Sequence, residues 1–327
     1  MHFGGVAIDA LRAAVGVPAA AYALAAIGLN IHYGYTGLLN FGQVAFMTVG
    51  AYGAATTVYH GGPLWLGFLV GAGLAVLLGL IMGLPTLRLR ADYLAIVTIA
   101  MAEILRLVNR SHTIEPLTQG VRGINGFAGA FYRVNPIHSG IYGWGSFSFS
   151  SRNLWVISVG WAMVALSCAL VFVLVRAPWG RVLRSIREDE DAARSLGKNV
   201  FGYKLQSLVL GGVIGAMAGM LIAVDQQSVS PDTYIAVLTF FAYVVLIMGG
   251  PARVLGPVLG SVIFWFIIQG SDGLLREAIR VRYVTFIGTT DVGAVRFALV
   301  GLLLMLLMIF RPQGILGRRE ELLVDER

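Results

Sequence analysis

The sequence predicts an all-α fold, a polytopic membrane helix bundle with about nine spans and a range of roughly eight to ten. Three observations predict it. Hydrophobic residues make up 57% of the 327 residues. Charged residues make up only 13%, whereas soluble domains carry about 25%. The apolar residues also gather in runs of roughly 20, the length that crosses a bilayer. We therefore expect one transmembrane domain, 1–327, in the plasma or inner membrane.

Each expected span is an apolar run bounded by polar or glycine-rich residues. The runs are 15–32, 42–60, 64–84, 92–109, 153–175, 203–224, 235–250, 255–272 and 294–311. Gly is abundant, with 42 residues, and glycine permits close helix packing in membranes. An odd number of spans puts the two termini on opposite sides. If the first or second run is re-entrant, the N-terminus lies on the same side as the C-terminus.

Basic residues between the runs predict the orientation. They gather in three segments. The first is 176–204, the second is the link after the third run, with Arg88 and Arg90, and the third is the C-terminal tail, with Arg311, Arg318 and Arg319. Nine spans place all three segments on one side. Since cytoplasmic loops carry the excess of Lys and Arg, that side and the C-terminus are expected in the cytosol.

The longest segment expected outside the cell is 110–152. It is rich in Gly, Ser, Asn and aromatic residues and holds four arginines. Long loops of this kind are usually functional or disordered, and the aromatic content argues against disorder. We expect an ordered external surface with short interfacial helices; a plain packing loop is the alternative.

Two glycine-rich breaks, 34–43 and 249–257, interrupt the apolar pattern in the two halves of the chain. Interrupted segments in both halves are typical of transport sites. Tight turns between spans are the alternative, above all for the second break.

The segment 176–204 is expected to hold a cytosolic helix over 181–197. Four apolar residues fall on one face, namely Val182, Ile186, Ala193 and Leu196. Opposite charges lie four positions apart on the exposed surface, in the three pairs Arg184–Glu188, Arg187–Asp191 and Glu190–Arg194. Gly197 is suited to end the helix. A solvated connector is the alternative, but a connector has no need of an apolar stripe.

Catalytic and cofactor motifs are missing from the sequence. A phosphate-binding loop needs G-x-x-x-x-G-K-[ST], and neither of the two lysines, Lys198 and Lys204, completes it. The five histidines show no metal-ligand spacing, and no nucleophile elbow occurs. We expect no enzyme activity, cofactor or metal site. The positive net charge of +7 is explained by membrane topology, not by nucleic-acid binding.

Polar residues within or beside the spans are candidates for a translocation path. Asn30, Asn40 and Gln43 flank the first break, and Glu103 lies within the fourth run with Arg106 one turn later. Charges inside membranes are costly and usually paired. The alternatives are polar packing between helices for the first three and a structural pair within one helix for the last two.

The residues Asp191-Ala192-Ala193-x-x-x-Gly197 resemble the Glu-Ala-Ala-x-x-x-Gly loop of ABC importer permeases, with Asp in place of Glu. The wider sequence is similar to the LivM-type permeases of branched-chain amino acid ABC importers. The matching stretches are 23–54, 83–103, 180–219 and 246–260, together with Gly123-Ile124-Asn125-Gly126, where the family often has Asn-Gly-Ile. Family members often have one more apolar span before the first run.

The resemblance implies a permease subunit that forms half of a translocation path for branched-chain or related amino acids. Its implied partners are a homologous LivH-type permease, two cytosolic ATPases of LivF and LivG type, and an external substrate-binding protein. The residues implied to couple it to an ATPase are Val182, Ile186, Arg187, Asp191, Ala192, Ala193, Leu196 and Gly197.

Two alternatives remain from the sequence. Importers of urea and short amides use similar permeases, and no residue separates them. A self-sufficient secondary transporter or channel usually carries mid-span acids or a filter segment, whereas only Glu103 is central here.

Overall fold

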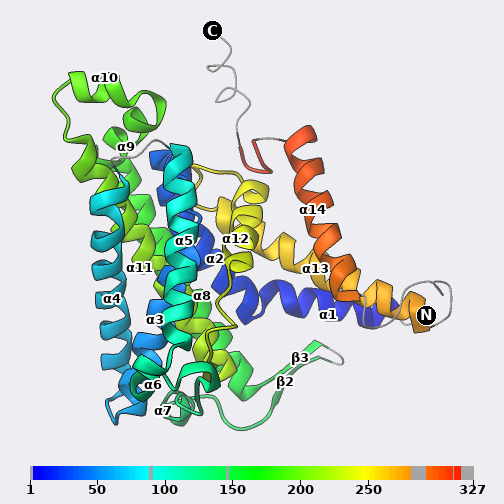
Figure 1. The fold of residues 1–327 in the computed structure, drawn as a ribbon. Coiled ribbons are helices and arrows are strands. Elements are labelled where there is room, and N and C mark those ends of the chain that lie inside the picture. The colour runs from blue at the N-terminus through cyan, green and yellow to red at the C-terminus, as the bar shows by residue number, and fades with distance from the viewer. Residues whose placement is uncertain (1–2, 88–90, 145–146, 281–291, 312, 318–327) are drawn as a thin grey trace.

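The computed structural model of the protein describes residues 3–87, 91–144, 147–280, 292–311 and 313–317, and it confirms the helical class (Figure 1). The long helices are α1 (Phe3–Val15), α2 (Val17–Leu29), α3 (Gln43–Tyr59), α4 (Leu64–Thr86), α5 (Ala91–Arg110), α8 (Ser151–Arg176), α11 (Val200–Gln226), α12 (Ala236–Gly249), α13 (Gly256–Arg280) and α14 (Val292–Phe310). A π-helical turn, η1 (Asn30–Tyr35), continues α2.

Every one of the nine expected apolar runs coincides with a helix, the first with α2 and η1 together. By length and composition alone, α4, α8, α11 and α13 can each cross a membrane. The helices Gly4–Val15 and Val17–Tyr35 meet at 42°, as one broken span or a re-entrant pair, and α12 and α14 are apolar but shorter. The described residues thus contain four helices of spanning length and composition, or five if the bent pair is one span.

The two ends of the bundle differ in structure. One end, at the top of Figure 1, holds α9 (Pro178–Glu188), α10 (Glu190–Ser195), the end of α4, the start of α5 and the end of α14. The opposite end holds the segment 110–152. This arrangement agrees with the predicted alternation of sides, although Arg88, Arg90, Arg318 and Arg319 lie outside the residues that the structure describes.

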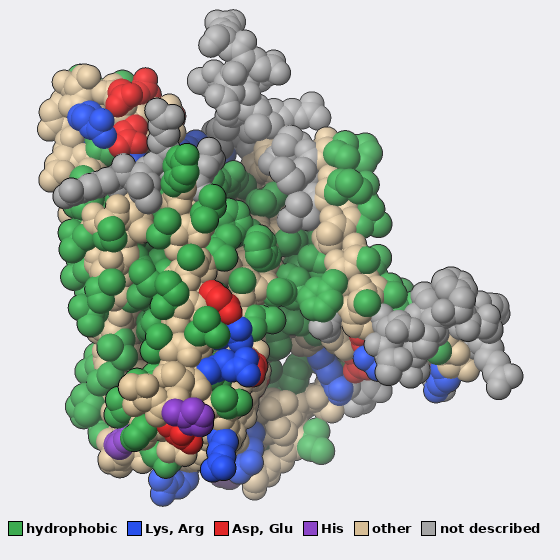
Figure 2. All heavy atoms as spheres, in the orientation of Figure 1, with side chains coloured by type: hydrophobic (Ala, Val, Ile, Leu, Met, Phe, Trp, Pro, Cys, Tyr) green, Lys and Arg blue, Asp and Glu red, His purple; other side chains and the backbone are tan. Residues whose placement is uncertain are grey.

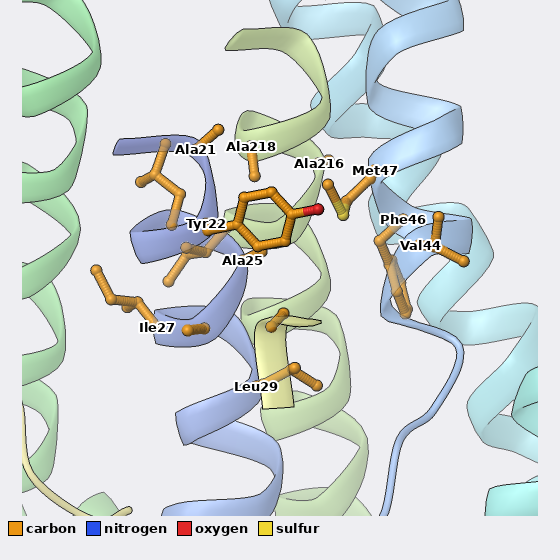
Figure 3. Close-up of a cluster of buried hydrophobic side chains, with 14 of the residues drawn as sticks. Ala21, Tyr22, Ala25, Ile27, Leu29, Val44, Phe46, Met47, Ala216 and Ala218 are labelled. Carbon is orange, nitrogen blue, oxygen red and sulfur yellow. The ribbon is translucent and has the colours of Figure 1, made fainter. Parts of the chain in front are cut away.

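The core is built around α11, which packs against α2, α3 and α4. Small residues let these helices approach closely: a Cβ atom on Gly28 would overlap the carbonyl oxygen of Gly211. Figure 3 shows part of the resulting apolar cluster, where Tyr22 of α2 and Met47 of α3 lie beside Ala216 and Ala218 of α11. By contrast, α4 exposes many leucines, as a helix that faces lipid would.

The segment 110–152 forms both short helices and strands in its described residues. It holds the short helices η2 (His112–Ile114), α6 (Glu115–Thr118), η3 (Gly120–Arg122) and α7 (Gly129–Arg133). It also holds three strands that the sequence did not predict. β1 (Ile124–Asn125) pairs with β4 (Ser228–Val229), and β2 (Ile141–Trp144) forms a hairpin with β3 (Phe147–Ser150).

Candidate coupling and translocation site

The segment 176–204 folds into two helices, so the prediction of one continuous helix over 181–197 is wrong. The break is at Asp189, whose backbone is extended and whose side chain accepts a hydrogen bond from the Ala192 amide at 2.9 Å. Asp is a strong N-cap residue, and a run of acids is unfavourable at a helix C-terminus. The four successive acids 188–191 therefore end α9 and begin α10.

Gly197 ends α10 as the sequence predicted. Its φ is +77°, and its amide bonds to the Arg194 carbonyl while the Lys198 amide bonds to the Ala193 carbonyl. These two bonds form a Schellman motif, which favours glycine because other residues are strained at positive φ. The motif turns the chain into α11.

The expected apolar stripe is divided between two environments. Ile186 and Ala193 are buried with Val200, and Val182 packs against them, so this part of the stripe attaches α9 and α10 to α11. Leu196 instead has 78% of its surface exposed. The exposed side of α10 also carries Asp191 and Ala192.

Of the three predicted ion pairs on this segment, the structure contains one, Glu190–Arg194 at 2.9 Å, and Glu190 also contacts Lys204. The other two arginines contact backbone groups. Arg184 donates to the Val175 carbonyl, and Arg187 donates to the Gly34 carbonyl, in the first glycine-rich break. The break at Asp189 explains the missing Arg187–Asp191 pair, because it removes the helical spacing between these two residues. Arg184 and Glu188 keep that spacing within α9, but Arg184 contacts the Val175 carbonyl instead.

The two breaks, far apart in the sequence, meet at Asn30. Its side-chain nitrogen donates to the Arg253 carbonyl at 2.8 Å, and its side-chain oxygen accepts from the Ala252 amide at 2.8 Å. The Asn30 side chain therefore satisfies one carbonyl and one amide of the second break. The second break also binds the segment after α14, where the Leu316 amide donates to the Gly249 carbonyl at 3.2 Å.

Asn40 and Gln43 belong to a buried polar network. The Asn40 amide nitrogen lies 3.1 Å from His32 Nδ1 and donates to Gln43 Oε1 at 3.2 Å, and Gln43 donates to the Gly211 carbonyl at 3.2 Å. His32 Nε2 lies 3.1 Å from the Leu208 carbonyl. These side chains are fully buried, so in this conformation they join α11 to the first break and do not line an open path.

Glu103 and Arg106 form the predicted pair, with 2.6 Å between Arg106 Nη2 and Glu103 Oε1. The sequence did not predict the third member, Asp232, which bonds Arg106 at 2.9 Å and Arg110 at 3.1 Å. Asp232 lies 126 residues from Arg106 along the chain, so no local spacing in the sequence indicates this contact. The Glu103 side chain is 47% exposed. Figure 2 shows that acidic and basic side chains interrupt an otherwise hydrophobic face over the lower half of α5.

In the segment 110–152, Tyr132 anchors α7 to the bundle. Its hydroxyl donates to the Val224 carbonyl at 3.0 Å, and the Arg152 guanidinium lies 5.5 Å from the centre of its ring. Partial burial, together with the nearby Asp225 carboxylate, raises the pKa of Tyr132. Arg122 and Arg133 remain exposed at this end.

The fold and these sites define a helical membrane protein of the permease class, without a recognisable catalytic motif. The family model described as "Branched-chain amino acid transport system / permease component" matches residues 13–311. The chain belongs to this family. It is thus a multi-pass membrane protein and a permease subunit of an ABC transport system.

Individual relatives agree with the family. The chain is 31% identical to the high-affinity branched-chain amino acid transport system permease protein LivM of Escherichia coli, over 90% of this chain and 67% of that protein. It is 25% identical to the permease protein LivH of the same organism, over 91% and 92%. It is 28% identical to the nucleoside ABC transporter permease protein NupC of Lactococcus lactis, over 70% and 71%.

Proposed function

We propose that this chain forms half of the translocation path of an ATP-driven importer for branched-chain or related amino acids. A homologous second permease supplies the other half, two cytosolic ATPases supply the energy, and an external protein delivers the substrate. The chain itself hydrolyses no ATP. In this proposal, the end that bears α9 and α10 faces the cytosol and the segment 110–152 faces outward.

The observation that carries the proposal is the structure of α10. A helix of six residues is too short to be stable in water by itself. Here the buried Ala193 and the Glu190–Lys204 contact hold it against α11, while Leu196 at its end is 78% exposed. An anchored helix with an exposed apolar tip is suited to enter a groove on an ATPase. The resemblance of Asp191–Gly197 to the importer loop supports the same role.

The face of α5 that carries Glu103 is the proposed wall of the path. Tyr93, Ile96, Ile104 and Leu107 are all more than half exposed on this helix. Glu103 lies seven residues before the end of α5, which is about 10 Å along a helix. Lipid chains tolerate a charge at that depth poorly. We therefore place the second permease and the water-filled path against this face.

The partner permease is proposed from the relatives. Both LivM and LivH of one organism resemble this chain over about nine-tenths of its length, so two homologous permeases coexist there. A pair would cover the α5 faces of both chains. The exposed Glu103–Arg106–Asp232 network would then lie beside the path between them.

The substrate class is tested through the external binding protein, because that protein normally selects what is carried. Its binding should be measured by calorimetry against leucine, isoleucine and valine, with urea, acetamide and a nucleoside as competitors. The nucleoside is included because the relative NupC is named for nucleosides. Binding of a branched-chain amino acid in preference to the others supports the proposal. Binding of urea or a nucleoside in preference would overturn the substrate assignment.

A further inference from the structure

Arg187 connects the coupling segment to the first break. Its Nη1 atom donates to the Gly34 carbonyl at 2.5 Å, although 153 residues separate the two in sequence. Its aliphatic stem packs against Gly37, where a Cβ atom would lie only 3.1 Å from Arg187 Cγ. Gly37 has a φ of +75°, so glycine suits both the backbone and the contact. Arg187 is therefore held at both ends of its side chain.

Gly34 in turn touches the second break. A Cβ atom on Gly34 would overlap Asn30 Oδ1 and would lie 2.6 Å from the Ala252 amide nitrogen. Asn30 and Gly34 are the first and fifth residues of the π-helical turn η1. The coupling segment, the first break and the second break thus meet at the backbone of one glycine.

The π-helical turn is suited to change shape. π-helices are rare, they occur mainly as single turns, and they are frequent at functional sites. The η1 turn lies between α2 and the loop that begins with Thr36, and a neighbouring bond runs from the Leu38 amide to the His32 carbonyl at 2.8 Å. A change in the shape of this turn would involve both the Gly34 carbonyl and Asn30, because both belong to it.

We propose that Arg187 is a positioning residue that transmits movement of the coupling segment, through Gly34 and Asn30, to both breaks. This inference rests on the proposed function. In this role Arg187 acts inside the permease and does not contact an ATPase. A charged donor makes a stronger bond to a carbonyl than a neutral one, which suits a contact that must persist through movement.

The test uses the complete complex in lipid nanodiscs, with the external binding protein. Hydrogen exchange of peptides from 178–197, 30–43 and 249–257 is compared with and without ATP and vanadate. In the unaltered protein, nucleotide should change exchange in all three. In Arg187→Ala, the change should remain in 178–197 and be lost from the other two. Arg181→Ala is the matched control, because Arg181 is exposed on the same helix and forms no hydrogen bond with the described residues of either break.

Transport gives a second readout. In proteoliposomes, Arg187→Ala should reduce substrate moved per ATP by about tenfold, the effect of one charge-assisted hydrogen bond on an equilibrium. Arg187→Lys keeps the charged donor and should recover part of the loss. The double variant Asn30→Ala with Arg187→Ala should be no worse than the poorer single variant, because both lie on one route.

The outcomes separate this inference from the proposed function. If nucleotide changes hydrogen exchange in none of the three segments of the unaltered complex, the coupling role of α9 and α10 is contradicted. The proposed transmission through Arg187 is then contradicted as well. If nucleotide changes hydrogen exchange at both breaks in Arg187→Ala as it does in the unaltered protein, only the proposed transmission through Arg187 is overturned. Independent, multiplicative losses in the double variant would also overturn it.

Discussion

The Glu103–Arg106 pair shows how much the energy of one contact depends on what covers it. The Glu103 side chain is 47% exposed in the single chain, and exposed ion pairs contribute about 0–1 kcal/mol. If a second permease covers the pair, removing one partner leaves an uncompensated buried charge, which costs about 3–5 kcal/mol. The position of the pair is thus informative about assembly.

A double-mutant cycle measures this difference. Glu103→Gln and Arg106→Gln should each cost about 1 kcal/mol or less in the solubilised single chain. In the assembled complex each should cost more, and the double variant should recover part of the loss. Thermal unfolding of both preparations is the measurement. Strictly additive losses in the complex would show that the pair does not function as a unit there.

Ala193 and Leu196 provide a contrast between packing and docking. Ala193 is buried against Ile186 and Val200, so Ala193→Trp should overpack the chain itself and cost about 1–3 kcal/mol of stability. Leu196→Asp should leave stability nearly unchanged because the side chain is exposed. It should, however, weaken co-purification with the ATPases. Normal recovery of the complex with Leu196→Asp would remove Leu196 from the docking surface.

Gly197→Val tests the Schellman motif. Nothing lies within 4 Å of a Cβ atom on Gly197, so the cost comes from the backbone at φ +77° and not from a clash. That cost is about 1–2 kcal/mol, and more for a β-branched residue. Membrane insertion should be normal and ATP stimulation by substrate reduced. Gly197→Asn, which tolerates the left-handed region better, should be milder, and equal behaviour of the two variants would exclude the backbone explanation.

At the scale of elements, the apolar runs predicted nine of the ten long helices of the described residues, because run length and hydrophobicity are local properties. The sequence did not predict α1, which carries Asp9 and Arg12. The contacts between elements were not predictable in this way. Asn30 was a path candidate by its place beside a break, but its partners Ala252 and Arg253 lie more than 200 residues away. The break at Asp189 had a local signal, four consecutive acids, which the helical periodicity obscured. The β1–β4 pairing is too short for a recognisable pattern.

The segment 110–152 is the element proposed to receive the external binding protein. Deleting 125–140 removes part of β1, all of α7 and the Tyr132 anchor. Uptake should be abolished, while the ATPases should still assemble at the far end. The charge reversal Arg122→Glu with Arg133→Glu is the milder variant, and it should weaken binding of the external protein without altering the fold. Uptake that survives both changes would exclude this segment as the platform.

At the scale of the whole molecule, the proposed coupling segment and the proposed external platform lie at opposite ends of the bundle. The α9–α10 segment lies at one end, the segment 110–152 at the other, and the α5 face with its charges lies between them (Figures 1 and 2). Asn30 and Arg187 link the breaks to the first of these ends. Such an arrangement suits a subunit that is driven from one side and loaded from the other.

Reconstituted uptake tests the central claim, that this chain is half of an ATP-driven path, most directly. Labelled substrate uptake is measured in proteoliposomes that contain this chain alone, with the second permease, and with the second permease and both ATPases, each with the external binding protein and ATP on their proper sides. We predict uptake only in the complete system, and its loss when ATP is withheld. Substrate accumulation by this chain alone, driven by a proton or sodium gradient, would contradict the claim.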